Sequence, residues 1–271
     1  MIKHKVAVIQ FETLTGRPDI NLDRTESFIE EAAESGSSLV CFPEMWTTGF
    51  DWQYLTDERS IHNQVIDEVM KLAKQYNIWI NGSMPYVDST GRIFNRSILF
   101  SPDGRICGTY DKIHLFRLIG EDRYLSAGDR LSIIDAPWGK TGLAICYDLR
   151  FPELFRLYAM NSVDVIIICA AFPDVRINHW RTLVRARAIE NQMYVIGVNR
   201  VGSENDDKGM SISFGGHSMI VDPWGEVVSE EDNLSEATFT GLINKELVDQ
   251  TRARLPVLSD KRDDIYQICM F

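Results

Sequence analysis

The sequence lacks the main features of secreted and membrane-spanning proteins. Its five cysteines are an odd number and contain no C-x-x-C pair, which argues against a disulfide framework and favours a reducing compartment. The longest apolar run, residues 163–172, is interrupted by Asp164 and is far too short to cross a bilayer. The first residues enter a strand-like segment without the apolar core of a signal peptide. These absences predict a cytoplasmic protein that makes no contact with a membrane.

Basic residues are also too few for a surface that binds nucleic acid. The chain has 28 Lys and Arg against 39 Asp and Glu, and its net charge of -11 repels phosphate backbones. Histidine spacing such as H-x-x-x-H is missing, so the sequence predicts no metal site. No linker rich in Gly, Ser or Pro divides the 271 residues. We therefore expect a single domain over residues 1–271.

Strand and helix patterns alternate in both halves of the chain. Short apolar runs indicate buried strands, and apolar residues at helical spacing indicate amphipathic helices. The predicted strands cover residues 6–9, 38–42, 78–80, 142–145, 163–169 and 193–198, and the predicted helices cover residues 22–33, 61–76, 152–160 and 178–191. The polar stretch 202–209 predicts a surface loop.

Two similar segments predict β-hairpins. Residues 97–106 and 218–227 each contain a strand-like run, a Pro-x-Gly turn and a second strand-like run. Hairpins cannot belong to a purely parallel sheet, so they indicate mixed sheets. The predicted fold class is therefore α/β (α+β), with mixed sheets whose outer faces are covered by helices.

Cys146 is the first candidate for catalysis. It lies where an apolar strand ends and a Tyr-Asp-Leu-Arg-Phe-Pro turn leads into a helix. Such a turn exposes a side chain and directs backbone N–H groups to one point, where they can bind an oxyanion. A free thiol with a pKa of about 8.5 is a poor nucleophile at neutral pH, so it needs a base and a cation nearby. The alternative is a buried cysteine at the end of a strand.

Three charged residues could supply the base and the cation. Glu44 follows an apolar strand, at the strand end where α/β sheets place their sites, and its apolar neighbours suit a general base. Lys112 follows the first predicted hairpin, and beside a thiol it would favour the thiolate and then the oxyanion. Glu121 lies nine residues further along. Each of them, taken alone, could equally be an ordinary surface residue.

The three motifs together resemble the nitrilase superfamily of carbon–nitrogen hydrolases. They are Phe-Pro-Glu at 42–44, Asp-Lys-x-His-Leu-Phe at 111–116 and Ile-Cys-Tyr-Asp-x-Arg-Phe-Pro-Glu at 145–153, and segments 188–192 and 216–225 are also similar. The resemblance implies a four-layer αββα sandwich, a homodimer and no cofactor. It also implies roles for five residues: Cys146 as nucleophile, Glu44 as general base, Lys112 as the third triad member, Glu121 as a residue that positions the lysine, and Tyr147 as the backbone donor that shares the oxyanion with Lys112.

The residues around the cysteine narrow this resemblance to amidases. Nitrile-cleaving members typically have Cys-Trp-Glu, whereas Cys-Tyr-Asp here is most similar to the omega-amidases, which act on omega-amides of 2-oxo dicarboxylic acids. Such a small amide carries a carboxylate, for which Arg176 is the candidate anchor. Arg176 could instead pair with Asp174. Phe116 and Phe172 are candidates for lining the pocket, although core packing is the commoner fate of aromatic residues.

Other functions remain open at this point. Within the same superfamily, the substrate could be an N-carbamoyl amino acid or a nitrile. A Cys-His hydrolase of the papain type would use a histidine as its base, with three candidates: His114, His179 and His217. The chain could also be a binding protein that kept the fold without the catalysis.

Overall fold

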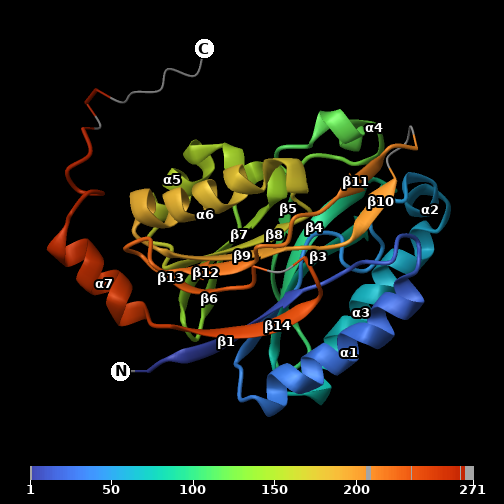
Figure 1. Ribbon diagram of the computed structural model, residues 1–271, viewed down its shortest axis with the longest axis horizontal. Helices are drawn as coiled ribbons and strands as arrows, with labels where there is room; N and C mark the ends of the chain where they lie inside the picture. The colour runs from blue at the N-terminus through green and yellow to red at the C-terminus, as the bar shows by residue number, and fades with distance from the viewer. Residues whose placement is uncertain (1, 206–208, 233, 263, 266–271) are drawn as a thin grey trace.

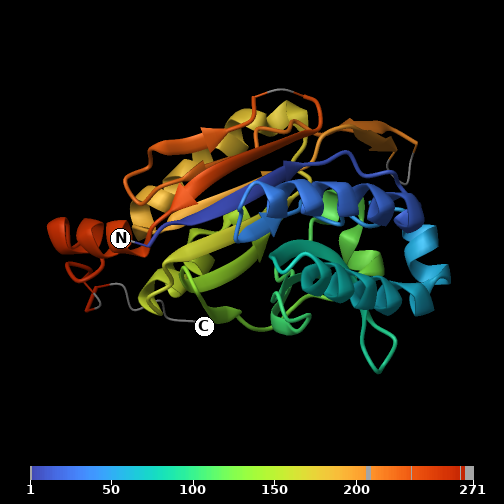
Figure 2. The ribbon, with the colours of Figure 1, turned by 90° about the horizontal axis from the view of Figure 1, so that it is seen from below.

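Two six-stranded mixed sheets face each other, and helices cover their outer faces (Figure 1). The computed structural model describes residues 2–205, 209–232, 234–262 and 264–265. Helices α1 (Pro18–Glu34) and α3 (Arg59–Gln75) lie on one outer face, and α5 (Pro152–Met160) and α6 (Ile177–Asn191) on the other. Figure 2 shows α1 and α3 side by side. The predicted fold class, a four-layer αββα sandwich, is confirmed.

The first sheet has the strand order β14-β1-β2-β3-β4-β5. Strands β1, β2 and β3 are parallel and are connected by helices, and β3, β4 and β5 then run antiparallel. The first predicted hairpin is therefore β4–β5. The bounds are β1 (His4–Gln10), β2 (Leu39–Cys41), β3 (Trp79–Val87), β4 (Ile93–Phe100), β5 (Ile106–Asp111) and β14 (Ala237–Ile243).

The second sheet repeats this plan, in the order β13-β12-β9-β8-β7-β6. Strands β7, β8 and β9 are parallel and are connected by α5 and α6, and the second predicted hairpin, β12–β13, is antiparallel to β9. The bounds are β6 (Ile133–Ala136), β7 (Gly139–Ile145), β8 (Val165–Ala170), β9 (Tyr194–Asn199), β12 (Met219–Val221) and β13 (Val227–Glu230).

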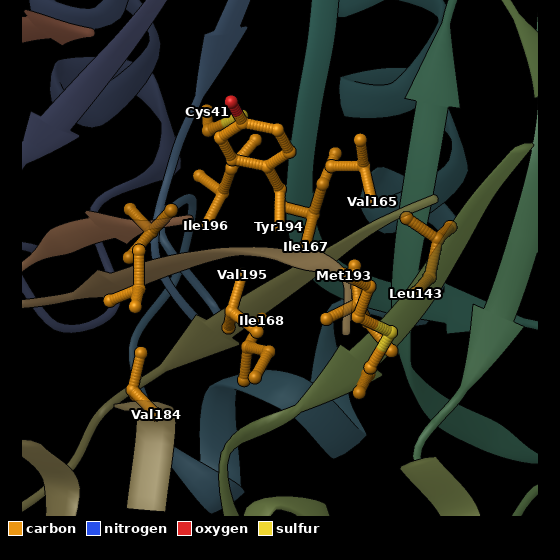
Figure 3. Packing of buried hydrophobic residues seen from close by; sticks show 14 of the residues in the cluster. Cys41, Leu143, Val165, Ile167, Ile168, Val184, Met193, Tyr194, Val195 and Ile196 are labelled. Carbon is orange, nitrogen blue, oxygen red and sulfur yellow. The ribbon is translucent and has the colours of Figure 1, made fainter. Parts of the chain in front are cut away.

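Alternation along the strands builds the two hydrophobic layers of each sheet. In β1, Val6 and Val8 pack in the core between the sheets, whereas Ala7 and Ile9 pack under the helices. This division follows from the period of two, which sends successive side chains to opposite faces. Figure 3 shows the same division in the second sheet: Tyr194, Ile196 and Ile167 lie on the side of Cys41, and Val195 and Ile168 on the side of Val184 in α6.

The remaining elements are short, except for the last helix. They are α2 (Trp52–Asp57), η1 (Arg117–Ile119), α4 (Glu121–Tyr124), η2 (Cys146–Arg150), η3 (Asp174–Arg176), β10 (Ser203–Asn205), β11 (Ser211–Ser213) and α7 (Lys245–Arg254). The predicted loop at 202–209 is wrong in part, because residues 203–205 pair with 211–213 as two strands; residues 206–208 lie outside the described residues. Among the described residues, no helix has the length and apolarity needed to cross a membrane.

Candidate active site

Strand ends from both sheets bring the predicted residues into one buried cluster. Glu44 lies three residues after β2, Lys112 directly after β5, and Cys146 directly after β7. Glu44 and Lys112 are each 1% exposed, and Cys146 is 9% exposed. The carboxyl ends of strands in α/β sheets are where such sites form, because the loops there converge.

The Lys112 ammonium group joins two buried carboxylates. Its Nζ lies 2.7 Å from Oε1 of Glu44 and 2.6 Å from Oε1 of Glu121. The second oxygen of Glu121, Oε2, accepts a hydrogen bond of 2.6 Å from the backbone N–H of Phe116. Glu121 is fully buried at the start of α4, so this bond and the lysine replace the water that its carboxylate loses.

Glu44 is held by donors on both of its oxygens. Its Oε1 also accepts a 2.8 Å hydrogen bond from the side-chain amide of Asn95 in β4, and its Oε2 accepts one of 2.8 Å from the backbone N–H of Ala171, just after β8. The apolar neighbours expected around Glu44 are there, since Met45 and Trp46 are fully buried. The carboxylate itself, however, faces polar donors from both sheets.

The Cys146 thiol is protonated at rest. Burial, and then the Glu44 carboxylate, raise its pKa well above the usual value, while Lys112 lowers it. A helix end and a lysine are therefore not sufficient to give a stable thiolate in this environment. The thiol needs a base that takes its proton during the reaction, and Glu44 is the carboxylate that acts most strongly on it.

The lysine keeps its charge although it is buried. Burial lowers the pKa of Lys112, but Glu121 and Glu44 together raise it above its usual value. Burial, partly offset by Lys112, raises the pKa of Glu121 to about 7. The two carboxylates therefore share one cation, and near neutral pH a proton on Glu121 relieves their repulsion.

The backbone is strained at two points of this cluster. Cys146 has a φ of 46° and Met45, next to Glu44, has a φ of 49°. A residue other than glycine in the left-handed region costs about 1–3 kcal/mol, and such strain is concentrated at functional sites. At Cys146 this conformation makes the sharp turn from β7 into η2 that the sequence predicts.

Aromatic rings line the chain next to Cys146. The rings of Phe116 and Tyr147 are 4.9 Å apart, and Tyr147 contacts Phe151 edge-on at 5.3 Å. His114 stacks on Phe151 at 3.6 Å. Phe116 and Tyr147 are both half-buried, so the candidate pocket residue and the candidate oxyanion residue share one wall of rings.

Phe172 and Arg176 lie on the segment that follows Ala171. Phe172 is 2% exposed and packs in the core against Trp180, and its role in lining a pocket stays a prediction. Arg176 ends η3 and is half-buried. Within the part of the chain that the structure describes, its side chain has no hydrogen-bond or ion-pair partner, and Asp174 does not pair with it.

The three histidines of the papain-type alternative are engaged elsewhere. Nδ1 of His114 lies 2.7 Å from Asp148, Nδ1 of His217 lies 2.9 Å from Glu230, and Nδ1 of His179 lies 3.4 Å from the Arg150 guanidinium. Among the described residues, no group of three or more His, Cys, Asp or Glu side chains could hold a metal ion. Cys41, Cys107, Cys146 and Cys169 are free, and Cys269 lies outside the described residues.

Sequence reasoning missed Asn95 and the Ala171 N–H. A signal for Asn95 was present, because Asn95 and Ser97 alternate as polar residues on one face of a strand whose other residues, apart from Arg96, are apolar. The Ala171 N–H is a backbone group, and its contact with Glu44 depends on the way in which the two sheets face each other. No pattern along the sequence contains that information.

Comparison with known proteins places this chain in a family. The model of the family described as carbon-nitrogen hydrolase matches residues 5–253. The chain is 34% identical to the 2-oxoglutaramate amidase of Bacillus subtilis (strain 168), over 98% of this chain and all of that protein. It is 33% identical to omega-amidase NIT2 of Homo sapiens, over 100% of this chain and 99% of that protein.

A solved structure shows the same fold. The carbon-nitrogen hydrolase from Helicobacter pylori G27 matches with a TM-score of 0.91 and 26% identity, covering 97% of each chain. The fold, the family model and the amidase-named relatives agree with one another. The chain belongs to the carbon–nitrogen hydrolase family and is a carbon–nitrogen hydrolase of the amidase kind.

Proposed function

We propose that this enzyme hydrolyses the omega-amide of a 2-oxo dicarboxylic acid and releases ammonia. The observation that carries the chemistry is the buried contact of Lys112 with Glu44 and Glu121, next to a thiol that is protonated at rest. The substrate class is supported by the similarity to the 2-oxoglutaramate amidase and omega-amidase relatives. The proposal assigns the activity to one domain over residues 1–271 that needs no cofactor.

The first half-reaction forms a thioester. Glu44 takes the proton of the Cys146 thiol, and the sulfur attacks the carbonyl carbon of the amide. Negative charge develops on the carbonyl oxygen, which the Lys112 ammonium group and the backbone N–H of Tyr147 stabilise. The C–N bond then breaks, and Glu44 gives its proton to the departing nitrogen, which leaves as ammonia. Tyr147 suits its role because it lies in the first turn of η2, where N–H groups lack intrahelical acceptors.

The second half-reaction hydrolyses the thioester. Glu44 removes a proton from water, and the resulting hydroxide attacks the thioester carbon. The C–S bond breaks, the sulfur regains a proton, and the free acid leaves. Glu121 acts through Lys112: its carboxylate holds the ammonium group in place, and its other oxygen holds the Phe116 backbone.

Replacing Glu44 tests this mechanism. Glu44→Gln keeps the shape of the side chain but cannot take a proton, so turnover of 2-oxoglutaramate should fall by at least about 10²-fold. Glu230→Gln, a change of the same kind at a carboxylate that pairs with His217, is the control and should keep its rate. A normal rate for Glu44→Gln would favour the papain-type alternative instead.

Mass spectrometry tests the identity of the nucleophile. After mixing with a small amide or a hydroxamate, we expect a covalent adduct on Cys146. An adduct on Cys41 or Cys107 would contradict the assignment, and no adduct at all would favour a binding protein that kept the fold. A parallel assay of ammonia release should rank 2-oxoglutaramate above N-carbamoyl amino acids and nitriles.

Arg176 is our candidate anchor for the carboxylate of the substrate. Its guanidinium can bind a carboxylate through two hydrogen bonds, and it has no protein partner among the described residues. Arg176→Met should raise KM for 2-oxoglutaramate by about tenfold or more, because a charged hydrogen bond is worth about 1.5–3 kcal/mol. KM for a short amide without a carboxylate should not change. An equal effect on both substrates would remove Arg176 from this role.

We also propose that the enzyme acts as a cytoplasmic homodimer. The family resemblance supports the dimer, and two exposed apolar side chains one turn apart on α5, Leu157 and Met160, offer apolar surface for it. Sedimentation or light scattering should give twice the chain mass of 31.0 kDa. A mass of one chain at micromolar concentration would contradict the proposal.

A further inference from the structure

Asp148 is a fully buried carboxylate two residues after Cys146. It accepts four hydrogen bonds: Oδ1 from the backbone N–H of His114 at 3.0 Å and from its Nδ1 at 2.7 Å, and Oδ2 from the Tyr110 hydroxyl at 2.8 Å and from the backbone N–H of Ile145 at 3.0 Å. These donors replace the water that the buried carboxylate loses.

These four donors belong to the two segments that carry the reactive groups. Tyr110 and His114 stand two residues before and two residues after Lys112. Ile145 directly precedes Cys146, and Asp148 itself follows it in η2. One side chain therefore ties the end of β5 in the first sheet to the end of β7 in the second.

We propose that Asp148 is a positioning residue that sets the placement of Lys112 relative to Cys146. Its bonds fix Lys112 from both sides, while Ile145 and the short turn of η2 fix Cys146. The inference rests on the roles proposed above for Cys146 and Lys112. Glu44 and Glu121 hold the lysine by its charge, whereas Asp148 holds the backbone and rings around it.

The pattern of donors requires a carboxylate at this position. Each oxygen of Asp148 accepts from one backbone N–H, His114 on one side and Ile145 on the other. Backbone N–H groups cannot act as acceptors, and the amide of an asparagine has one accepting oxygen. In either orientation of the amide, Asp148→Asn would therefore set an NH₂ group against a backbone N–H. The Tyr110 hydroxyl or the His114 ring can turn to accept from that NH₂ group, but the backbone N–H beside it still loses its acceptor.

Asp164 provides a matched control at the other end of the same strand. It is also buried, and its Oδ2 accepts a 2.9 Å hydrogen bond from the backbone N–H of Lys140, near the start of β7. Lys140 lies five residues before Ile145, which is about 16 Å along a strand. Asp164 itself directly precedes β8, so Asp164→Asn makes the same chemical change against the start of β7, away from the lysine and the thiol.

The experiment compares Asp148→Asn with Asp164→Asn in the full-length chain. We expect kcat to fall by about 10²-fold in Asp148→Asn, the size of loss that a displacement of about 1 Å produces, with little change in KM. Asp164→Asn should keep kcat within about twofold, even if its melting temperature falls as much as that of Asp148→Asn. Equal kcat losses in both variants, or a loss confined to KM, would overturn the inference.

Hydrogen exchange separates this inference from the proposed catalytic roles. In Asp148→Asn, amide protection should fall both in residues 110–116 and in residues 144–149, whereas in Asp164→Asn it should fall near residue 140 and in α7, where Lys245 and Arg252 face Asp164. This readout does not depend on any substrate, so it holds even if the enzyme proves inactive on every amide. Unchanged protection of residues 110–116 in Asp148→Asn would overturn the inference.

Discussion

The two β-hairpins follow the same plan but lie in different surroundings. Each comes after three parallel strands, and each pairing has one register shift, at Leu99/Phe100 in β4 and at Ile220/Val221 in β12. The first strand of each hairpin, β4 in one and β12 in the other, is buried. The second strand β5, however, has the buried Tyr110 next to its last residue and leads to Lys112, whereas β13 is exposed or half-buried throughout.

The segment after each hairpin accounts for this difference. After β5, a segment with η1 and α4 folds back, so that the N–H of Gly128 bonds the carbonyl of Lys112 and Glu121 contacts its ammonium group. After β13, the chain passes within a few residues to β14 at the edge of the first sheet. A repeated motif can therefore hold a buried charge only where a further segment covers it, because an uncovered lysine would stay hydrated.

Replacing the lysine at the end of the first hairpin should have the largest effect. Lys112→Met leaves Glu44 and Glu121 facing each other without a cation, so we expect a loss of about 3–5 kcal/mol in the free energy of unfolding. The oxyanion also loses a donor, which should lower kcat by about 10²–10³-fold. Urea unfolding and steady-state kinetics measure the two effects. Arg105→Met, at the exposed turn of the same hairpin, is the control and should change neither.

Asn95 in β4 should give the next largest effect. Asn95→Ala removes the amide that fixes Oε1 of Glu44, so kcat should fall by about 10-fold or more, the value of a hydrogen bond to a charged group. Asn81→Ala is the matched control, since Asn81 is equally buried in β3 but bonds Ser97 and the Ile98 carbonyl. It should lose stability and keep kcat. If both variants lost kcat alike, Asn95 would have no separate effect on the base.

Glu121, in the segment of η1 and α4 that covers Lys112, should make the stability of the protein depend on pH. Because the pKa of Glu121 is raised to about 7 in the fold, its contribution to stability is fully present below the unfolded pKa of about 4.3 and is lost as the pH rises through 7. Glu121→Gln has no such titration. Relative to this variant, the wild type should therefore lose on the order of 1–3 kcal/mol between pH 5 and pH 8 in urea unfolding. A constant difference over this range would contradict the raised pKa.

The second hairpin should give the smallest effect. Val227 in β13 is 39% exposed, so Val227→Thr should change the free energy of unfolding by no more than about 0.5 kcal/mol and leave kcat unchanged. Thermal unfolding and steady-state kinetics are sufficient to test this. A large kcat loss would mean that the two hairpins do not differ in the way described above.

The sequence was most informative where local pattern and burial agree. The predicted helix at 152–160 matches α5 residue for residue, because Pro152 begins it and apolar spacing continues it. Strand β14 and helix α7 went unpredicted. Strand β14 is half-exposed, and α7 is polar with Val248 and Thr251 as its buried residues, so neither shows a strong apolar period.

The residues of the candidate site also differ in whether a local pattern could predict them. Glu44, Lys112, Glu121 and Cys146 were predicted from motifs, and the structure brings these four side chains into contact or close range. The polar alternation in β4 marks Asn95 but not its partner, and no pattern marks the Ala171 N–H, because both reach Glu44 through long-range packing. The partners of Asp148 depend on the same long-range packing.

The protonated state of Cys146 has a consequence for the enzyme in the presence of peroxide. Peroxide oxidises thiolates far more readily than thiols, and cysteines with a low pKa in open sites are the ones that it converts to sulfenic acid. Cys146 is 9% exposed and its pKa is well above the usual value, so the resting enzyme presents peroxide with an S–H group in a nearly closed site. We therefore expect Cys146 of the resting enzyme to react slowly with peroxide.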